Sequence, residues 1–243
     1  MSAPGAPVER TVGIPARYNG PPASGNGGYV CGRVAAAVDG PAEVTLHVPP
    51  PLERPLSLIR TPGGAQLHDG DTLIADAVPT TVDLRPPAIV TLADAERAAA
   101  GYPGFSDHAF PTCFVCGPQR AAGDGLRVFV GPVAGAHVAA APWTPAPDLA
   151  DSAGVVRPEV VWAALDCPSY FGGPVGVLAV LGRLAVDIRA PVIAGQPHVV
   201  LGWGRGSERR KHFAAAAITD GAGNLLAVSR ATWIELREPP PVP

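Results

Sequence analysis

Lysine, long hydrophobic runs and clusters of charge are all scarce in this sequence of 243 residues. Lys211 is its single lysine and only 16% of the residues are charged, which argues against a basic surface that binds nucleic acid. No apolar run approaches the roughly 20 residues that a membrane-spanning helix needs. Residues 1–7 lack a basic region followed by an apolar one, so the sequence predicts no signal peptide and a cytoplasmic protein.

Several catalytic motifs are absent as well. No G-x-S-x-G segment is present, which excludes the nucleophile elbow of many serine hydrolases. A phosphate-binding G-x-x-x-x-G-K-[ST] loop and a dinucleotide-binding G-x-G-x-x-G segment after a strand are also missing. The sequence therefore predicts no nucleotide and no other cofactor.

Proline and glycine are abundant. The 30 prolines and 29 glycines are spread along the chain and punctuate many short elements. With 47% hydrophobic residues and a net charge of −3, the composition is typical of a soluble globular protein. The length suits one large domain or two domains of about 100–120 residues each.

The first half of the chain predicts one helix followed by strands. Residues 1–14 show little periodicity and are interpreted as an arm. Residues 29–38 predict a helix, and residues 42–48 alternate with a period of two, as a half-buried strand does. Residues 65–77 predict a hairpin that turns at Asp69-Gly70.

The second half predicts the same order of elements. Its helix begins at Pro158 and is expected to end at residue 167, because Pro168 lacks the N–H that continues a helix. The other predicted elements are a helix over residues 88–100 and strands over residues 56–59, 126–130, 136–141, 178–188, 198–203, 212–219 and 225–236.

Similar segments recur in the two halves, which indicates an internal repeat. The matched pairs are residues 44–51 with 184–191 and residues 67–75 with 218–227. We therefore divide the chain after the arm into an N-terminal repeat, residues 15–105, and a C-terminal repeat, residues 106–238.

Two helix segments carry a resemblance to a known family. Asn26–Arg33 is similar to the glycine-led helix start of hotdog acyl-CoA thioesterases, and Ala164–Phe171 is similar to their helix segment with the catalytic aspartate. Over roughly residues 15–85 and 120–237 the chain resembles type II acyl-CoA thioesterases, which carry two hotdog repeats in one polypeptide. The resemblance implies an α+β double hotdog, with an antiparallel sheet wrapped around a central helix in each repeat.

The resemblance also implies roles for residues of both helices. Asp166 would be the general base or the nucleophile, and the amides of Gly27 and Gly28 would polarise the thioester carbonyl, assisted by the helix dipole. The residues that it places around the acyl thioester are Asn26, Tyr29, Trp162 and Tyr170.

The sequence departs from the family pattern in the polar residues of the later strands. Ser207 is the nearest candidate for the hydroxyl residue that positions water. Residues 229–232, Ser-Arg-Ala-Thr, stand where the family has a glutamine. Glu159 is a rival base on the same helical face as Asp166, although near the helix start it also complements the helix dipole.

Each of these residues also has a purely structural interpretation. Asp166 could face solvent or pair with Arg157 or Arg183. The glycines could permit a tight contact between a helix and a strand, and Asn26 could be a plain N-cap.

The stretch from Arg205 to His212 is the one concentrated basic segment of the sequence. Coenzyme A carries phosphates, so a cationic loop at the mouth of an acyl site would suit it. The candidates for this contact are Arg205, Arg209, Arg210 and Lys211. The alternative is an ordinary solvated hairpin loop.

Cys113 and Cys116 form a C-x-x-C pair, with His108 upstream. Structural zinc usually takes four ligands from two such pairs, and the remaining cysteines, Cys31 and Cys167, lie in predicted helices. Packed thiols in a turn are therefore the favoured interpretation over zinc or redox chemistry, and no metal site is predicted.

The sequence thus favours a cytoplasmic acyl-CoA or acyl-carrier-protein thioesterase. A second possibility is a double hotdog that binds an acyl thioester or another apolar ligand without hydrolysing it. A hotdog enoyl-CoA hydratase is disfavoured because neither central helix contains a histidine. The expected partner is a small acyl thioester, with no nucleic acid and no membrane, and a homodimer is also expected.

Overall fold

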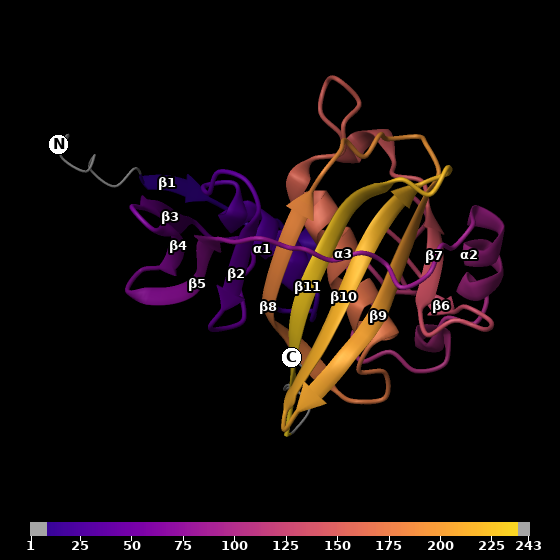
Figure 1. Ribbon diagram of the computed structural model, residues 1–243. Coiled ribbons are helices and arrows are strands. Elements are labelled where there is room, and N and C mark those ends of the chain that lie inside the picture. Colours follow the sequence, from indigo (N-terminus) through magenta and orange to yellow (C-terminus); the bar gives the residue numbers. More distant parts are fainter. Residues whose placement is uncertain (1–8, 238–243) are drawn as a thin grey trace.

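The computed structural model describes residues 9–237, whose eleven strands form one antiparallel sheet (Figure 1). The strand order across the sheet is β1-β3-β4-β5-β2-β8-β11-β10-β9-β7-β6. The strands are β1 Glu9–Val12, β2 Ala42–Leu46, β3 Leu56–Thr61, β4 Gly64–Asp69, β5 Thr72–Pro79, β6 Gly131–Pro132, β7 Ala139–Trp143, β8 Ala179–Ile188, β9 His198–Glu208, β10 Lys211–Asp220 and β11 Leu225–Glu235. The helices are α1 Gly27–Ala35, α2 Leu92–Ala99 and α3 Pro158–Gly172, with short 3₁₀ turns at Ala16–Tyr18, Pro103–Phe105 and Pro147–Leu149.

The N-terminal half of the sheet follows the sequence pattern closely. β4 and β5 form the predicted hairpin, and Gly70 turns it with a φ of 55°, a conformation that glycine adopts readily. Part of the expected arm is a strand instead, because β1 pairs with β3 at the edge of the sheet. Residues 1–8 of that arm lie outside the described residues.

The C-terminal half contributes the four longest strands, β8 to β11. The turn between β10 and β11 is set by Asp220, whose Oδ1 accepts hydrogen bonds from the N–H groups of Ala222 at 2.9 Å and Asn224 at 2.8 Å. Such Asx turns close tight connections between strands. The two halves join where β2 pairs with β8, with Val44 opposite Leu184, so one sheet runs through the whole molecule.

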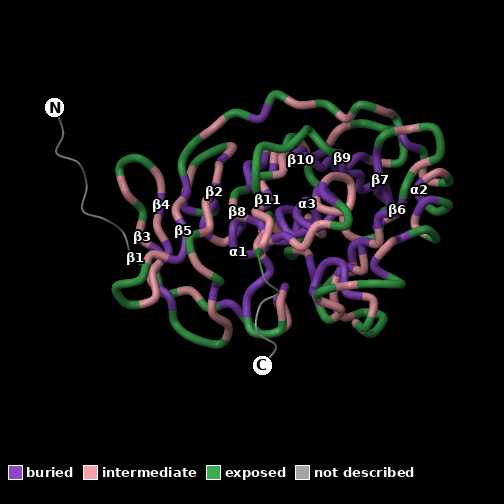
Figure 2. The backbone as a smooth tube through the Cα atoms, turned by 90° about the horizontal axis from the view of Figure 1, so that it is seen from below, coloured by how far each residue is buried: buried purple, intermediate pink, exposed green. Residues whose placement is uncertain are grey.

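The two faces of the sheet are covered differently (Figure 1). Along β10, Ala214, Ala216 and Ile218 belong to the core beneath α1 and α3. The alternate residues, Ala215 and Ala217, belong to a second cluster beneath the crossover after β5 and α2. Figure 2 shows the resulting burial, with the central helices and strands buried and the outer loops exposed.

The crossover after β5 carries the chain from one end of the sheet to the other. It leads to α2, which packs against β7 at the far end of the C-terminal half (Figure 1). α2 falls within the predicted N-terminal repeat, so part of that segment lies against the other half. The division at residues 105 and 106 stays a prediction.

Two predicted elements differ from the structure. Residues 126–130 form no strand; the N–H of Leu126 instead donates to the carbonyl of Phe114 at 2.7 Å and the N–H of Val128 to that of Val115 at 2.9 Å. α3 does not end at residue 167 but continues through Pro168 to Gly172. Its residues from 160 to 169 are all buried, and this packing outweighs the hydrogen bond that proline cannot make. No helix among the described residues is long and apolar enough to cross a membrane.

Candidate functional site

Asp166 lies in the middle of α3 and is almost completely buried, with 2% of its surface exposed. Its Oδ2 accepts hydrogen bonds from the backbone N–H of Gly28 at 2.8 Å and from Nδ2 of Asn26 at 3.0 Å. Its Oδ1 has no hydrogen-bond partner among the groups that the structure describes. One carboxyl oxygen is thus fixed by the start of α1, and the other is buried without a partner among the described groups.

Two glycines of α1 allow this approach. A Cβ on Gly28 would lie 2.5 Å from Cβ of Asp166 and 2.7 Å from the carbonyl oxygen of Trp162. A Cβ on Gly32, one turn later, would lie 2.5 Å from Cα of Glu159. The face of α3 that carries Glu159, Trp162 and Asp166 therefore packs directly on α1. The tight contact between a helix and a strand predicted for Gly27 and Gly28 is present at Gly27, which faces Leu181 of β8, whereas Gly28 packs on α3 instead.

Asn26 is the N-cap that the sequence predicts, and it also contacts Asp166; its role in binding substrate stays a prediction. Its Oδ1 accepts the N–H of Tyr29 at 2.9 Å, which is the N-cap of α1. Its Nδ2 donates to Asp166, 140 positions along the chain. Asp166 consequently lies at the positive end of the α1 dipole, a favourable place for a carboxylate.

Burial raises the pKa of the Asp166 carboxyl from 3.8 to about 7. The hydrogen bonds from Gly28 and Asn26 oppose this shift because they stabilise the charged form, while negative charge on Cys113 adds to it. Near neutral pH the carboxyl is therefore divided between its two protonation states, which suits a group that both takes and returns a proton.

This raised pKa predicts how Asp166 affects stability. The folded protein holds the Asp166 proton up to about pH 7, whereas an unfolded aspartate releases it near 3.9, so stability falls as the pH rises through this window. Replacement with the neutral Asp166→Asn should then remove a penalty of a few kcal/mol above pH 7 and none below pH 4. Urea unfolding of the wild type and of Asp166→Asn at pH 4 and pH 8 measures this difference. A chelator in both samples removes any metal that the protein carries. An equal difference at both pH values would contradict the raised pKa.

The alternative ion pairs predicted for Asp166 are wrong. Arg157 lies beside Glu159, with 3.6 Å between Nε and Oε1. Arg183 pairs with Glu43 at 3.4 Å, across the junction of β8 and β2. Glu159 keeps 18% of its side chain exposed, so it is less suited than Asp166 to act as a buried base.

The aromatic residues predicted around the substrate are packed on one another. Tyr29 stacks on Tyr18 with 3.9 Å between ring centroids, and its pKa is raised to about 12, mainly by burial. Trp162 is buried at the contact between the helices. Tyr170 is half-buried, donates its hydroxyl to the carbonyl of Val177 at 2.7 Å and lies beside Trp233. An acyl chain has no room between α1 and α3 where they cross.

The residues predicted to bind the phosphates of coenzyme A lie apart from the contact between α1 and α3. Arg205, Ser207, Arg209, Arg210 and Lys211 are all exposed at the end of the β9–β10 hairpin. Ser207 pairs with His212 across the hairpin, so its hydroxyl is not the neighbour of Asp166 that the resemblance implied. Gly27 lies against Leu181, where an added Cβ would come within 2.9 Å of Cδ2.

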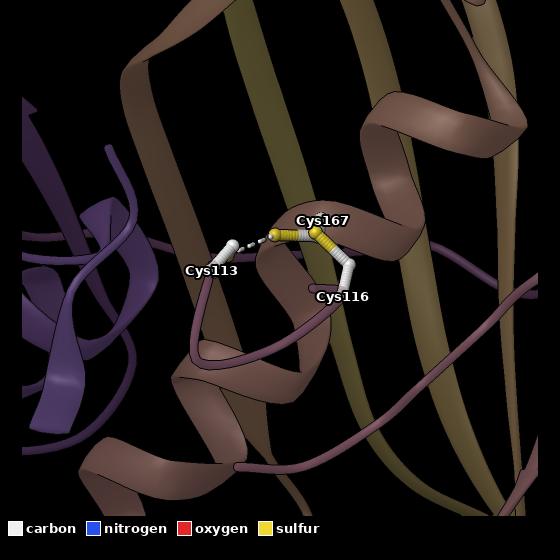
Figure 3. Close-up of side chains that lie close together, drawn as sticks. All are labelled: Cys113, Cys116 and Cys167. Carbon is white, nitrogen blue, oxygen red and sulfur yellow. Dashed lines mark hydrogen bonds between the residues drawn. The ribbon is translucent and has the colours of Figure 1, made fainter. Parts of the chain in front are cut away.

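A cluster of thiols adjoins the carboxylate (Figure 3). Cys113 and Cys116 from the loop and Cys167 from α3 point toward one another, with 3.7 Å between Sγ of Cys113 and Sγ of Cys167. Nδ2 of Asn26 lies 3.9 Å from each of these two sulfurs. Nε2 of His108 lies 3.3 Å from Sγ of Cys116. All four cysteines of the chain are free and buried.

Sequence reasoning missed the third member of this cluster. Cys167 follows Asp166 directly, but its place in a helix concealed that the C-x-x-C loop packs against it. It also missed Ser169, whose hydroxyl donates to the carbonyl of Asp166 at 2.7 Å and accepts the indole N–H of Trp233 at 2.9 Å. These contacts hold α3 on the sheet below the carboxylate, and no pattern of neighbouring residues in the sequence predicts them.

Ser229 occupies the region where the family has its glutamine. Its hydroxyl accepts the N–H of Ala216 at 3.2 Å and lies 3.5 Å from the carbonyl of Leu165. It is fully buried and serves to join α3 to the sheet. Two surface depressions, of about 310 and 270 Å³, are lined by N-terminal residues such as Leu58 and Ile14, away from Asp166.

Comparison of the structure with solved ones identifies the architecture. A conserved protein of unknown function from Alicyclobacillus acidocaldarius, described as having a hotdog fold, matches with a TM-score of 0.56 and 12% identity, over 99% of this chain and 96% of that one. The chain therefore has a hotdog fold. The expected α+β hotdog architecture is confirmed, with one central helix packed on each half of the sheet.

Other hotdog proteins of similar length give the same result. A candidate thioesterase II from Thermobifida fusca matches with a TM-score of 0.59 and 16% identity, over 94% of this chain and 92% of that one. The tesB protein of Mycobacterium avium subsp. paratuberculosis matches with a TM-score of 0.56 and 9% identity, over 86% of each chain. No protein-family model matches the sequence, and neither does any curated protein. At these identities the likeness establishes the fold.

Proposed function

We propose that this chain hydrolyses acyl thioesters of coenzyme A or of a carrier protein, with Asp166 as the base that activates water. The observation that carries the proposal is the pairing of a buried carboxyl with the start of the facing helix. Oδ2 of Asp166 accepts the N–H of Gly28 at 2.8 Å, and Oδ1 has no partner. A base beside a backbone donor is the arrangement that acyl transfer needs.

Hydrolysis of the thioester would pass through a tetrahedral oxyanion. Oδ1 of Asp166 removes a proton from water while the water oxygen adds to the thioester carbon, giving a tetrahedral oxyanion. The oxyanion replaces Oδ2 of Asp166 as the acceptor of the Gly28 N–H, and the positive end of α1 stabilises its charge. The oxyanion then collapses, the C–S bond breaks, and the departing sulfur takes the proton from Asp166. The products are the free acid and the free thiol.

Entry of substrate would require movement around Asp166. The loop that contains Cys113 and Phe114 closes this side, since Phe114 packs edge-on against Tyr29 and Sγ of Cys113 lies near Asn26. We therefore expect this loop to move when the thioester binds. The exposed cations from Arg205 to Lys211 supply positive charge that could receive the phosphates of coenzyme A at the protein surface.

A non-catalytic acyl-binding protein is the second candidate. Two observations favour it: Ser229 stands where the family has a glutamine and is engaged with Ala216 and α3, and Asp166 is closed to solvent. A binder needs the enclosed apolar surroundings but not the polar network that positions water.

A panel of acyl-CoAs separates the two candidates. Incubation with short, medium and long acyl-CoAs should release free coenzyme A, detected by a thiol reagent, in proportion to protein and time. A blank without substrate corrects for the four cysteines of the chain. Tight binding in calorimetry with no thiol released would establish the binder and reject the hydrolase. Association into a homodimer and a cytoplasmic location stay predictions.

A further inference from the structure

We propose that Cys113, Cys116 and Cys167, completed by His108, bind a thiophilic divalent cation, with Zn²⁺ as the expected ion. The three sulfurs all lie within 4.8 Å of one another and come from two separate parts of the fold. The C-x-x-C spacing supplies two ligands from one turn, and α3 supplies the third. This site does not depend on the proposed hydrolysis.

The spacing of the sulfurs suits tetrahedral coordination. Zinc lies about 2.3 Å from each thiolate, which places neighbouring sulfurs about 3.8 Å apart. The distance between Sγ of Cys113 and Sγ of Cys167 is 3.7 Å. Little movement is needed to bring three thiolates around one ion (Figure 3).

His108 is the nearest candidate for a fourth ligand, but it lies outside the group of three sulfurs and its ring must move to complete the site. Its Nε2 lies 3.3 Å from Sγ of Cys116, close to the roughly 3.5 Å that separates nitrogen and sulfur ligands of one zinc ion. Its Nδ1 accepts the N–H of Phe110 at 2.9 Å, so in the neutral ring the proton is on Nε2. Ligation through Nε2 moves that proton to Nδ1 and turns the ring away from Phe110. We therefore expect His108 to add less affinity than any of the thiolates.

The surroundings suit thiolates bound to a cation. The three cysteines are buried, and unpaired thiolates there would be costly without a compensating positive charge. Nδ2 of Asn26 lies 3.9 Å from the sulfurs of both Cys113 and Cys167; one of its two hydrogens goes to Asp166, and the other can be donated to one of these sulfurs as a supporting contact around the metal. A bound ion would tie the loop to α3 at the residue that follows Asp166, and would therefore oppose the loop movement that entry of a thioester requires.

Metal analysis of the purified full-length chain tests the site. We expect one zinc per chain, and a chelator should lower the melting temperature by about 5–10 °C. Substitution with Co²⁺ should give a sulfur-to-cobalt charge-transfer band and the intense visible bands of tetrahedral coordination. Absence of zinc and of the charge-transfer band in the fully reduced protein would overturn the proposal. These measurements on the wild type need no variant to fold.

Matched variants then identify the ligands. Cys113→Ser, Cys116→Ser and Cys167→Ser should each lower the affinity for zinc at least about 100-fold, and His108→Asn about 10-fold. Cys31→Ser is the control, because Cys31 is equally buried in α1 but outside the cluster. Loss of zinc from the Cys31→Ser protein to the same degree would contradict the assignment. So would a purified protein whose mass is lower by two hydrogens, since it would hold a disulfide where the ion is expected.

Discussion

Asp166→Asn is expected to lower the kcat for acyl-CoA hydrolysis by about 10³-fold while the protein stays folded. Both donors to the carboxyl, from Gly28 and Asn26, bond the same oxygen, Oδ2. The amide oxygen of an asparagine can replace that oxygen and keep both hydrogen bonds. Its NH₂ group then stands in the place of Oδ1, where it cannot take a proton from water. Steady-state hydrolysis, with circular dichroism as the check on folding, measures the effect.

Glu159→Gln is the matched control. Glu159 lies on the same face of α3, but it is partly exposed and sits beside Arg157 at the helix start. We expect its kcat to stay within about threefold of the wild type. Unchanged turnover in Asp166→Asn would remove Asp166 from the mechanism, and an equal loss in Glu159→Gln would make Glu159 the stronger candidate.

Gly28→Ala is expected to be the most destabilising small substitution at the site. Its Cβ would meet the carbonyl oxygen of Trp162 at 2.7 Å, Cα of Ala163 at 3.0 Å and Cβ of Asp166 at 2.5 Å. Two of these atoms are backbone, so no side-chain rotation relieves the contact and the helices must separate. Overpacking of this kind costs about 3 kcal/mol, which corresponds to a melting temperature lower by about 10 °C.

Gly63→Ala is the control for this substitution. Gly63 lies in the turn between β3 and β4, and a Cβ there meets nothing within 4 Å. We expect its melting temperature to stay within about 2 °C of the wild type. Scanning calorimetry of both variants checks the pair. A stable Gly28→Ala protein would mean that α1 can retreat from α3, and that the carboxyl is held less tightly than its hydrogen bonds indicate.

Separation of the helices would also change the chemistry. The N–H of Gly28 and the carboxyl of Asp166 come from residues 138 positions apart, and only the contact between α1 and α3 holds them together. Loss of that contact should lower hydrolysis even in the fraction of Gly28→Ala protein that stays folded. The same small residue thus sets both the packing of the two helices and the geometry of the proposed site.

The sequence alone determined the features that depend on neighbouring residues. The hairpin at Gly70, the turn at Asp220 and the N-cap at Asn26 each follow from local turn and cap chemistry. The alternating strands of the C-terminal half and the start of α3 at Pro158 follow from periodicity and from the fixed φ of proline. The segment around Asp166 also led to the hotdog fold.

Only the tertiary structure decided which distant groups meet. The packing of the C-x-x-C loop against Cys167, and the burial that lets α3 continue past Pro168, arise between segments far apart in the chain. The tertiary structure also decided that neither Arg157 nor Arg183 pairs with Asp166, because each arginine lies beside another carboxylate. Periodicity and turn chemistry report on contacts within a few residues, whereas these contacts depend on how whole helices and strands pack. That is why the sequence could indicate a carboxylate but not the thiols beside it.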